Sequence, residues 1–178
     1  MSTGFYGKIP SAGDFVTWNL PRVFVERWDR WMSMELRDRP EQDALNPRVW
    51  RFAVSSGIFC PEPCAGAWRM SEDRVGRRYP LAVVLIGSCP DGADPWYDGV
   101  ADLLSSAIEE EWPVARLQER LAGLGTPSGE GAADRIAFWT DEPEATALAF
   151  ADIFDLADNG LPAMRTGASV PGVLACGS

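Results

Sequence analysis

The fold class is indicated most clearly by one stretch of sequence, Tyr79-Pro80-Leu81-Ala82-Val83-Val84-Leu85-Ile86. A nearly continuous apolar run of this length is typical of a central strand that is buried on both faces of a sheet. Pro80 cannot donate a hydrogen bond to a neighbouring strand, so we expect it at the start of this one. Two further apolar runs, 49–54 and 67–70, precede it through short connections, which favours an antiparallel meander over parallel crossovers.

Helical periodicity lies on both sides of these strands. After Pro21, which suits the first turn of a helix, Phe24, Trp28 and Trp31 recur at three- and four-residue spacing and form an apolar stripe that ends at 39–40. Later in the chain we expect helices over 96–112, 114–124 and 142–154, a strand over 135–140, and a loop over 123–131 that its composition predicts to be mobile.

These patterns predict a single α/β domain over residues 1–158. A further strand is expected over 4–9, and the sheet should be mixed or largely antiparallel, with helices packed on it as a three-layer α/β/α sandwich. Residues 159–178 are small, Gly-rich and nearly aperiodic, so we expect a flexible or edge-packing tail.

Charge restricts the classes of partner. The chain has 16 basic and 26 acidic residues and a net charge of −10. Binding to nucleic acid depends largely on Lys and Arg, so DNA, RNA and anionic membranes are poor partners for this protein. The N-terminus shows no signal peptide, and the longest apolar run is far too short to span a membrane. We therefore expect a soluble, cytoplasmic protein.

The chain contains no histidine. This removes Ser-His-Asp and Cys-His catalysis and histidine metal ligation together. Cys60 and Cys64 have a spacing seen in zinc knuckles, but a structural zinc site needs four ligands, and Cys89 and Cys176 stand apart. Reduced thiols are expected, with a Cys60–Cys64 disulfide as the alternative and zinc as the least favoured one. No metal or cofactor is expected.

The first polar constellation is Gly7-Lys8-Ile9-Pro10-Ser11-Ala12-Gly13-Asp14-Phe15. Its glycines and proline specify a shaped turn, and the Asp14 carboxylate can accept backbone N–H bonds within that turn. The spacing of a phosphate-binding loop is absent. Asp14 is therefore expected to hold its own turn, with an arginine of the second constellation as a further partner.

The second constellation, residues 71–81, holds the only basic cluster in the sequence. Asp73 is followed by Arg74, Arg77 and Arg78. Exposed arginines can bind carboxylate or phosphate groups through paired hydrogen bonds. The structural alternative is a hairpin loop in which Asp73 and Arg74 stabilise the turn.

An enzyme remains the alternative to a binding module. It would use Asp14 and Asp73 as acid and base, with the arginine cluster holding a phosphorylated or carboxylated substrate. The eight tryptophans do not favour a ligand, because most of them fall on faces that are predicted to be buried.

Four motifs occur in an order that resembles the N-terminal domain of the TagF family, over about the first half of the chain. The sequence departs from the family pattern at Ala12, where a basic residue is frequent, and at Arg78, where an aromatic residue is frequent. The motifs are Gly4-Phe5-Tyr6-Gly7-Lys8-Ile9-Pro10-Ser11-Ala12-Gly13-Asp14-Phe15, Trp28-Asp29-Arg30-Trp31, Pro47-Arg48-Val49-Trp50-Arg51-Phe52 and Asp73-Arg74-Val75-Gly76-Arg77-Arg78-Tyr79-Pro80-Leu81.

The resemblance implies a bacterial, cytoplasmic, non-enzymatic protein. TagF-like proteins restrain the type VI secretion system after translation, through its forkhead-associated scaffold protein. A structural subunit of the apparatus is a third hypothesis. The residues expected to bind the partner or to support the binding surface are Lys8, Asp14, Asp73, Arg74, Arg77 and Arg78.

Overall fold

The structure is a computed structural model that describes residues 1–37, 48–129, 131, 136–140, 155–156 and 162–163. Within these ranges the chain forms a six-stranded antiparallel sheet with the strand order β2-β1-β5-β4-β3-β6. The strands are β1 (Ser2–Gly7), β2 (Val16–Trp18), β3 (Val49–Val54), β4 (Cys64–Glu72), β5 (Arg78–Ile86) and β6 (Ile136–Trp139).

Strand β5 lies in the middle of the sheet, as its apolar sequence predicts. It pairs with β1 on one side and with β4 on the other, so that Ala82 lies opposite both Tyr6 and Trp68. Its side chains alternate between two cores: Leu81 contributes to one and Val84 to the other. Pro80 is the third residue of β5, beyond the last pair with β1, so its missing N–H is tolerated there.

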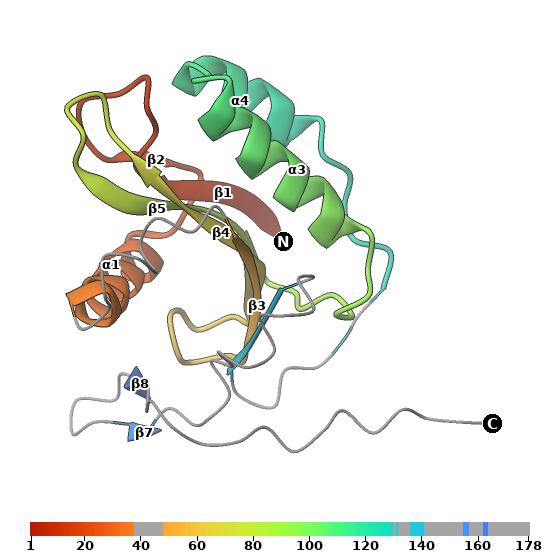
Figure 1. Cartoon of the computed structure of the whole chain (residues 1–178). Helices are drawn as coiled ribbons and strands as arrows, with labels where there is room; N and C mark the ends of the chain where they lie inside the picture. Colours follow the sequence, from red (N-terminus) through yellow and green to blue (C-terminus); the bar gives the residue numbers. More distant parts are fainter. Residues whose placement is uncertain (38–47, 130, 132–135, 141–154, 157–161, 164–178) are drawn as a thin grey trace.

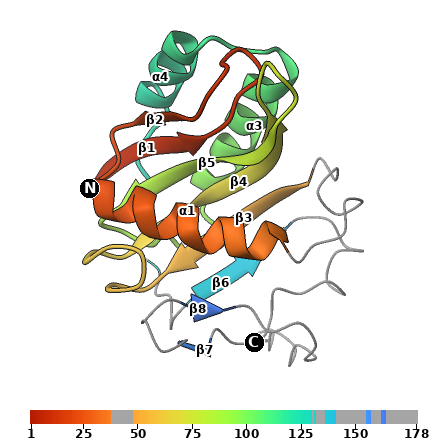
Figure 2. The ribbon, with the colours of Figure 1, turned by 90° about the vertical axis from the view of Figure 1, so that its left-hand side faces the viewer.

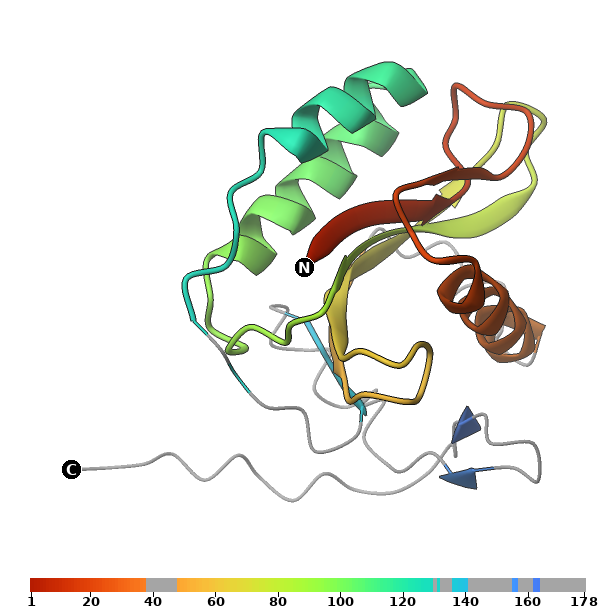
Figure 3. The same cartoon turned by 180° about the vertical axis from the view of Figure 1, so that it is seen from behind.

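Helices cover both faces of the sheet and confirm the three-layer arrangement (Figures 1 and 2). Helix α1 (Arg22–Arg37) lies on one face. Helices α3 (Trp96–Glu109) and α4 (Val114–Ala122) lie on the other, and Figure 3 shows the same separation from behind. No helix in the described ranges has the length and apolar character needed to cross a membrane.

The apolar stripe of α1 is buried, as predicted. Phe24, Trp28 and Trp31 are all at most 1% exposed. The Trp28 ring lies 5.0 Å from the ring of Phe52 on β3 and 5.4 Å from that of Phe59. Aromatic side chains of α1 therefore pack closely against this face of the sheet.

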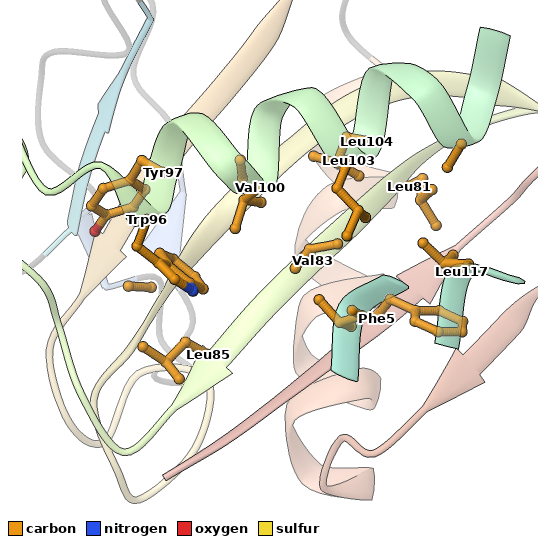
Figure 4. Packing of buried hydrophobic residues seen from close by; sticks show 14 of the residues in the cluster. Phe5, Leu81, Val83, Leu85, Trp96, Tyr97, Val100, Leu103, Leu104 and Leu117 are labelled. Atoms are coloured by element: carbon orange, nitrogen blue, oxygen red, sulfur yellow. The ribbon is translucent and has the colours of Figure 1, made fainter. Parts of the chain in front are cut away.

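The opposite core is mainly aliphatic. Val100 and Leu104 of α3 pack toward Val83 of β5, and Leu117 of α4 lies beside Phe5 of β1 (Figure 4). The end of α3 turns sharply into α4 at Glu111, which has a positive φ of 51°. Pro113 then precedes the first residue of α4, as the sequence predicts.

Asp94 connects the start of α3 to the loop that follows α4. One carboxylate oxygen accepts a hydrogen bond from the Trp96 N–H, and the other accepts bonds from Ser128 N, Ser128 Oγ and Gly129 N. The loop that composition predicts to be mobile is thus anchored at Ser128 and Gly129.

Other expectations differ from the structure in their bounds. Strand β1 ends at Gly7 rather than at residue 9, and β4 extends well beyond 67–70 in both directions. The sequence did not predict β2. The expected helix over 142–154 lies outside the described residues, as does most of the expected tail, of which only β8 (Pro162–Ala163), paired with β7 (Asp155–Leu156), is described.

Candidate functional site

The two polar constellations meet at one end of the sheet. The loop between β1 and β2 lies beside the loop between β4 and β5, as the views from the front and from behind agree (Figures 1 and 3). The Arg74 N–H donates to the Ala12 carbonyl at 2.9 Å, and Arg77 Nη2 donates to the Gly13 carbonyl at 2.5 Å. Two segments about sixty residues apart in sequence therefore form one surface.

Asp73 holds this pair of loops together. Its Oδ1 accepts hydrogen bonds from the N–H groups of Val75 and Arg77 at 3.0 and 2.9 Å. Its Oδ2 accepts from Lys8 Nζ at 2.5 Å and from Arg77 Nε at 2.7 Å. Both Lys8 and Asp73 are buried, so this is a desolvated ion pair with further hydrogen bonds, not a surface contact. Gly76, with a φ of 80°, permits the tight return of the chain between the donors.

The surroundings of Asp73 keep it ionised. Burial by itself raises the pKa of the carboxyl group, but hydrogen bonds from Lys8 and Arg77 outweigh burial and hold that pKa well below its usual range. Both oxygens already accept two hydrogen bonds each. Asp73 is therefore an ionised carboxylate that links the two loops through its four hydrogen bonds.

Asp14 has a smaller role than the sequence suggests. It is exposed, and its Oδ1 accepts a hydrogen bond from the N–H of the next residue, Phe15, at 2.8 Å. Within the described residues it forms no ion pair with an arginine. Asp14 therefore accepts a backbone N–H within its own turn, as expected, whereas the expected contact with an arginine is made by Asp73 instead.

Phe15 is the surface residue that sequence reasoning missed. Its ring stacks on Tyr6 at 5.5 Å and meets the edge of Tyr79 at 4.8 Å, while Lys8 Nζ lies 4.7 Å from the ring centre. Tyr6 is fixed in turn by its hydroxyl, which donates to Asp29 Oδ1 at 3.0 Å. Phe15 is nevertheless 41% exposed. The signal available in the sequence was a large aromatic residue directly after a turn made of small residues, proline and aspartate.

The remaining charged groups of the two loops face solvent. Arg74 and Arg78 are exposed, and neither forms an ion pair within the part of the chain that the structure describes. Arg77 divides its guanidinium between Asp73 and Gly13. Of the predicted site residues, the structure thus joins the buried Lys8 and Asp73 to the exposed Arg77 in one network, and leaves Asp14, Arg74 and Arg78 on the surface outside it.

The first loop is also fixed to the helical layer. Ser11 Oγ donates to the carbonyl of Trp112, in the turn between α3 and α4, at 2.7 Å. The Trp112 ring is covered by Arg116, whose guanidinium lies 4.4 Å from it. The surface therefore has supports in both the sheet and the helices.

The cysteines lie at the other end of β4. Cys60, Cys64 and Cys89 are buried free thiols, while Cys176 lies outside the described residues. A hydrogen bond between the thiols of Cys60 and Cys64 lowers the pKa of Cys60 and raises that of Cys64. No group of three or more potential metal ligands occurs among the described residues.

Comparison with known proteins adds the biological context. Residues 4–124 match the family model of the TagF N-terminal domain, described as type VI secretion system-associated. The crystal structure of PA0076 from Pseudomonas aeruginosa PAO1 is similar, with a TM-score of 0.65 and 32% sequence identity over 80% of this chain and 73% of that chain. No curated protein sequence matches the chain significantly. The matched residues include both loops of the candidate site.

Proposed function

Because the chain belongs to the TagF N-terminal domain family of type VI secretion-associated proteins, we propose that it restrains type VI secretion after translation by binding a component of the apparatus. The partner that we propose is the cytoplasmic forkhead-associated scaffold protein. The chain acts in the cytoplasm, as a non-enzymatic regulator that needs no metal, nucleotide or other cofactor.

The observation that supports this proposal is the rigid pair of loops. The Lys8–Asp73–Arg77 network fixes the backbone on which Arg74 and Arg78 stand, so little conformational freedom is lost when a partner binds. We propose that Arg74 and Arg78 contact the partner, that Asp14 lies at the edge of this contact, and that the Lys8–Asp73–Arg77 network supports them.

The alternative enzyme is less well supported. It requires a carboxylate that can exchange a proton with a substrate, whereas Asp73 is saturated with hydrogen bonds and has a lowered pKa. Asp14 is exposed to solvent, whereas a catalytic group usually lies in a partly enclosed cleft.

A secretion assay tests the proposal. In a strain that lacks the native gene, the wild-type chain is produced at graded levels and a secreted substrate of the apparatus is measured in the medium. We expect secretion to fall as the level of the chain rises. Unchanged secretion, together with no scaffold bound to the chain, contradicts the proposal.

A matched pair of variants links the effect to the site. Arg74→Glu combined with Arg78→Glu should relieve repression, because it reverses the charges of the two exposed arginines that form no ion pair within the described residues. Arg22→Glu combined with Arg30→Glu makes the same charge change on the exposed side of α1 and should repress as the wild type does. If both variants repress secretion equally well, the proposed regulatory role stands, but the contact surface must lie elsewhere on the chain.

A further inference from the structure

We infer that this surface binds an acidic protein segment that also carries an apolar side chain, with the carboxylates on Arg74 and Arg78 and the apolar group on Phe15 and Val75. The inference rests on the proposed function and specifies the chemistry of the partner. We call these four residues the contact face. Each of them is exposed in the structure.

The charge of the contact face differs from that of the molecule. The whole chain carries −10, yet three arginines lie within five residues of one loop. The buried Lys8–Asp73 pair is neutral as a unit, and Arg74 and Arg78 have no ion-pair partner in the described ranges. Unpaired guanidinium groups held on a fixed backbone favour carboxylates, which they bind through two parallel hydrogen bonds.

The apolar part of the contact face is equally localised. Phe15 is 41% exposed and Val75 is 66% exposed, and the two loops contribute both of them. The Phe15 ring is already held by Tyr6 and Tyr79, so its side chain loses little freedom on binding. Aromatic and arginine side chains dominate the binding energy of many protein interfaces, and the two adjacent loops carry one exposed aromatic residue and two exposed arginines that form no ion pair within the described residues.

The same charges argue against a polyanion as the occupant. DNA or an anionic membrane would extend beyond the two loops and meet the acidic remainder of the chain. At physiological ionic strength charges act over roughly 8 Å, so a short acidic segment interacts with the arginines while the rest of the molecule is screened. A protein segment is therefore the occupant to which the observations point.

The first test measures binding of the purified full chain to the purified scaffold protein over a series of NaCl concentrations. We expect wild-type affinity to fall with salt. The Arg74→Ala and Arg78→Ala double variant should bind about tenfold more weakly or worse, with a flatter salt dependence. The control, Arg22→Ala with Arg30→Ala, should retain both the affinity and the salt dependence.

The apolar contribution needs its own pair of variants. Phe15→Ser should weaken binding by about tenfold while the salt dependence stays as in the wild type, because an apolar contact carries no charge. Val23→Ser, at an apolar position of α1 with similar exposure, is the matched control and should bind normally. Circular dichroism and thermal melts of each variant establish that the fold is kept.

Photo-crosslinking identifies the segment that binds. Benzoylphenylalanine is placed at position 75, and the crosslinked scaffold peptide is identified by mass spectrometry. We expect a segment with an excess of Asp and Glu around at least one large apolar residue. The inference is overturned if the crosslinked segment lacks that excess, or if the arginine double variant binds the scaffold as the wild type does. It is also overturned if the wild-type chain binds a 20-mer DNA or anionic vesicles as well as it binds the scaffold. If the wild type binds no scaffold at all, the proposed function itself fails, and the two failures are thereby distinguished.

Discussion

Asp73 is the residue on which the contact between the two loops depends. It receives four hydrogen bonds, two of them from cationic side chains, while fully buried. Replacing it by Asn keeps the size but removes the charge and puts an N–H₂ group against two cations. We expect Asp73→Asn to lower the free energy of unfolding clearly at pH 7. Asp14→Asn, at an exposed carboxylate, should change it little; urea unfolding of both variants gives the comparison.

The pH dependence follows from the lowered pKa of Asp73. Its pKa in the folded protein lies below the ordinary value of 3.8, so the ionised form stabilises the fold above that pH. This stabilisation is lost as the pH falls below about 4 toward the native pKa. We therefore expect the stability difference between wild type and Asp73→Asn to be largest at neutral pH and to shrink on acidification. A difference that is constant from pH 7 to pH 3 contradicts this account of the network.

The site could be located from the sequence, but its internal roles could not be assigned. Both loops were identified by their residue types, and Lys8, Asp73 and the arginines were all named. Which aspartate meets the cations depends on a contact between residues 8 and 73, and the register of β1, β5 and β4 sets that contact. Local spacing contains no information about it. The position of Phe15 on this surface could not be predicted for the same reason, because its partners Tyr6 and Tyr79 come from two different strands.

Helix α1 is held to the sheet by its aromatic stripe. Trp28 is fully buried against Phe52 and Phe59. Trp28→Ala should lower the free energy of unfolding by about 3–5 kcal/mol, because a large cavity replaces the ring. Met34→Ala, on the exposed side of the same helix, should cost no more than about 0.5 kcal/mol. Chemical denaturation measures both, and a loss below about 1 kcal/mol for Trp28→Ala contradicts the packing described here.

The anchoring of the loop after α4 is testable by hydrogen exchange. Asp94 accepts hydrogen bonds from the amide N–H groups of Ser128 and Gly129. The bond from the Trp96 N–H, together with these two, lowers the pKa of Asp94. In Asp94→Ala the Ser128 and Gly129 amides should exchange about tenfold faster or more, because their acceptor is gone. Asp91→Ala removes a nearby exposed carboxylate and should leave both amides as they are. Fast exchange already in the wild type would show that the anchor is not formed.

Helices and strands with a strong apolar pattern were predictable from the sequence, whereas strands that are very short or contain small residues were not. The apolar run of β5 and the stripe of α1 each identify a buried surface from sequence alone. Strand β4 was expected to begin only at residue 67 because Ala65 and Gly66 precede it and give little apolar pattern. In the structure, a Cβ atom on Gly66 would lie 2.1 Å from the Val83 carbonyl, so a small residue is required there. Strand β2 has only three residues, too few for an alternating pattern to be recognised.

The architecture as a whole leaves the two loops at one end of the sheet, where we propose the contact with the partner. Helices cover both faces of the sheet, and the two loops with the contact face extend from one end of it (Figures 1 and 3). A structure of this kind holds a binding surface rigidly while the sheet and helices supply stability. This agrees with a regulator that acts by contact, and it also leaves a structural subunit of the apparatus as an alternative to be tested.

Affinity purification of the tagged full chain from its native bacterium tests the central proposal most directly. If the chain restrains secretion by binding the scaffold, the scaffold protein should be recovered with the wild type and with the Arg22→Ala/Arg30→Ala control. It should be depleted with Arg74→Ala/Arg78→Ala, and assembled particles of the apparatus should be absent from all three. Recovery of assembled particles would identify a structural subunit instead. Recovery of no scaffold with the wild type would contradict the proposed function.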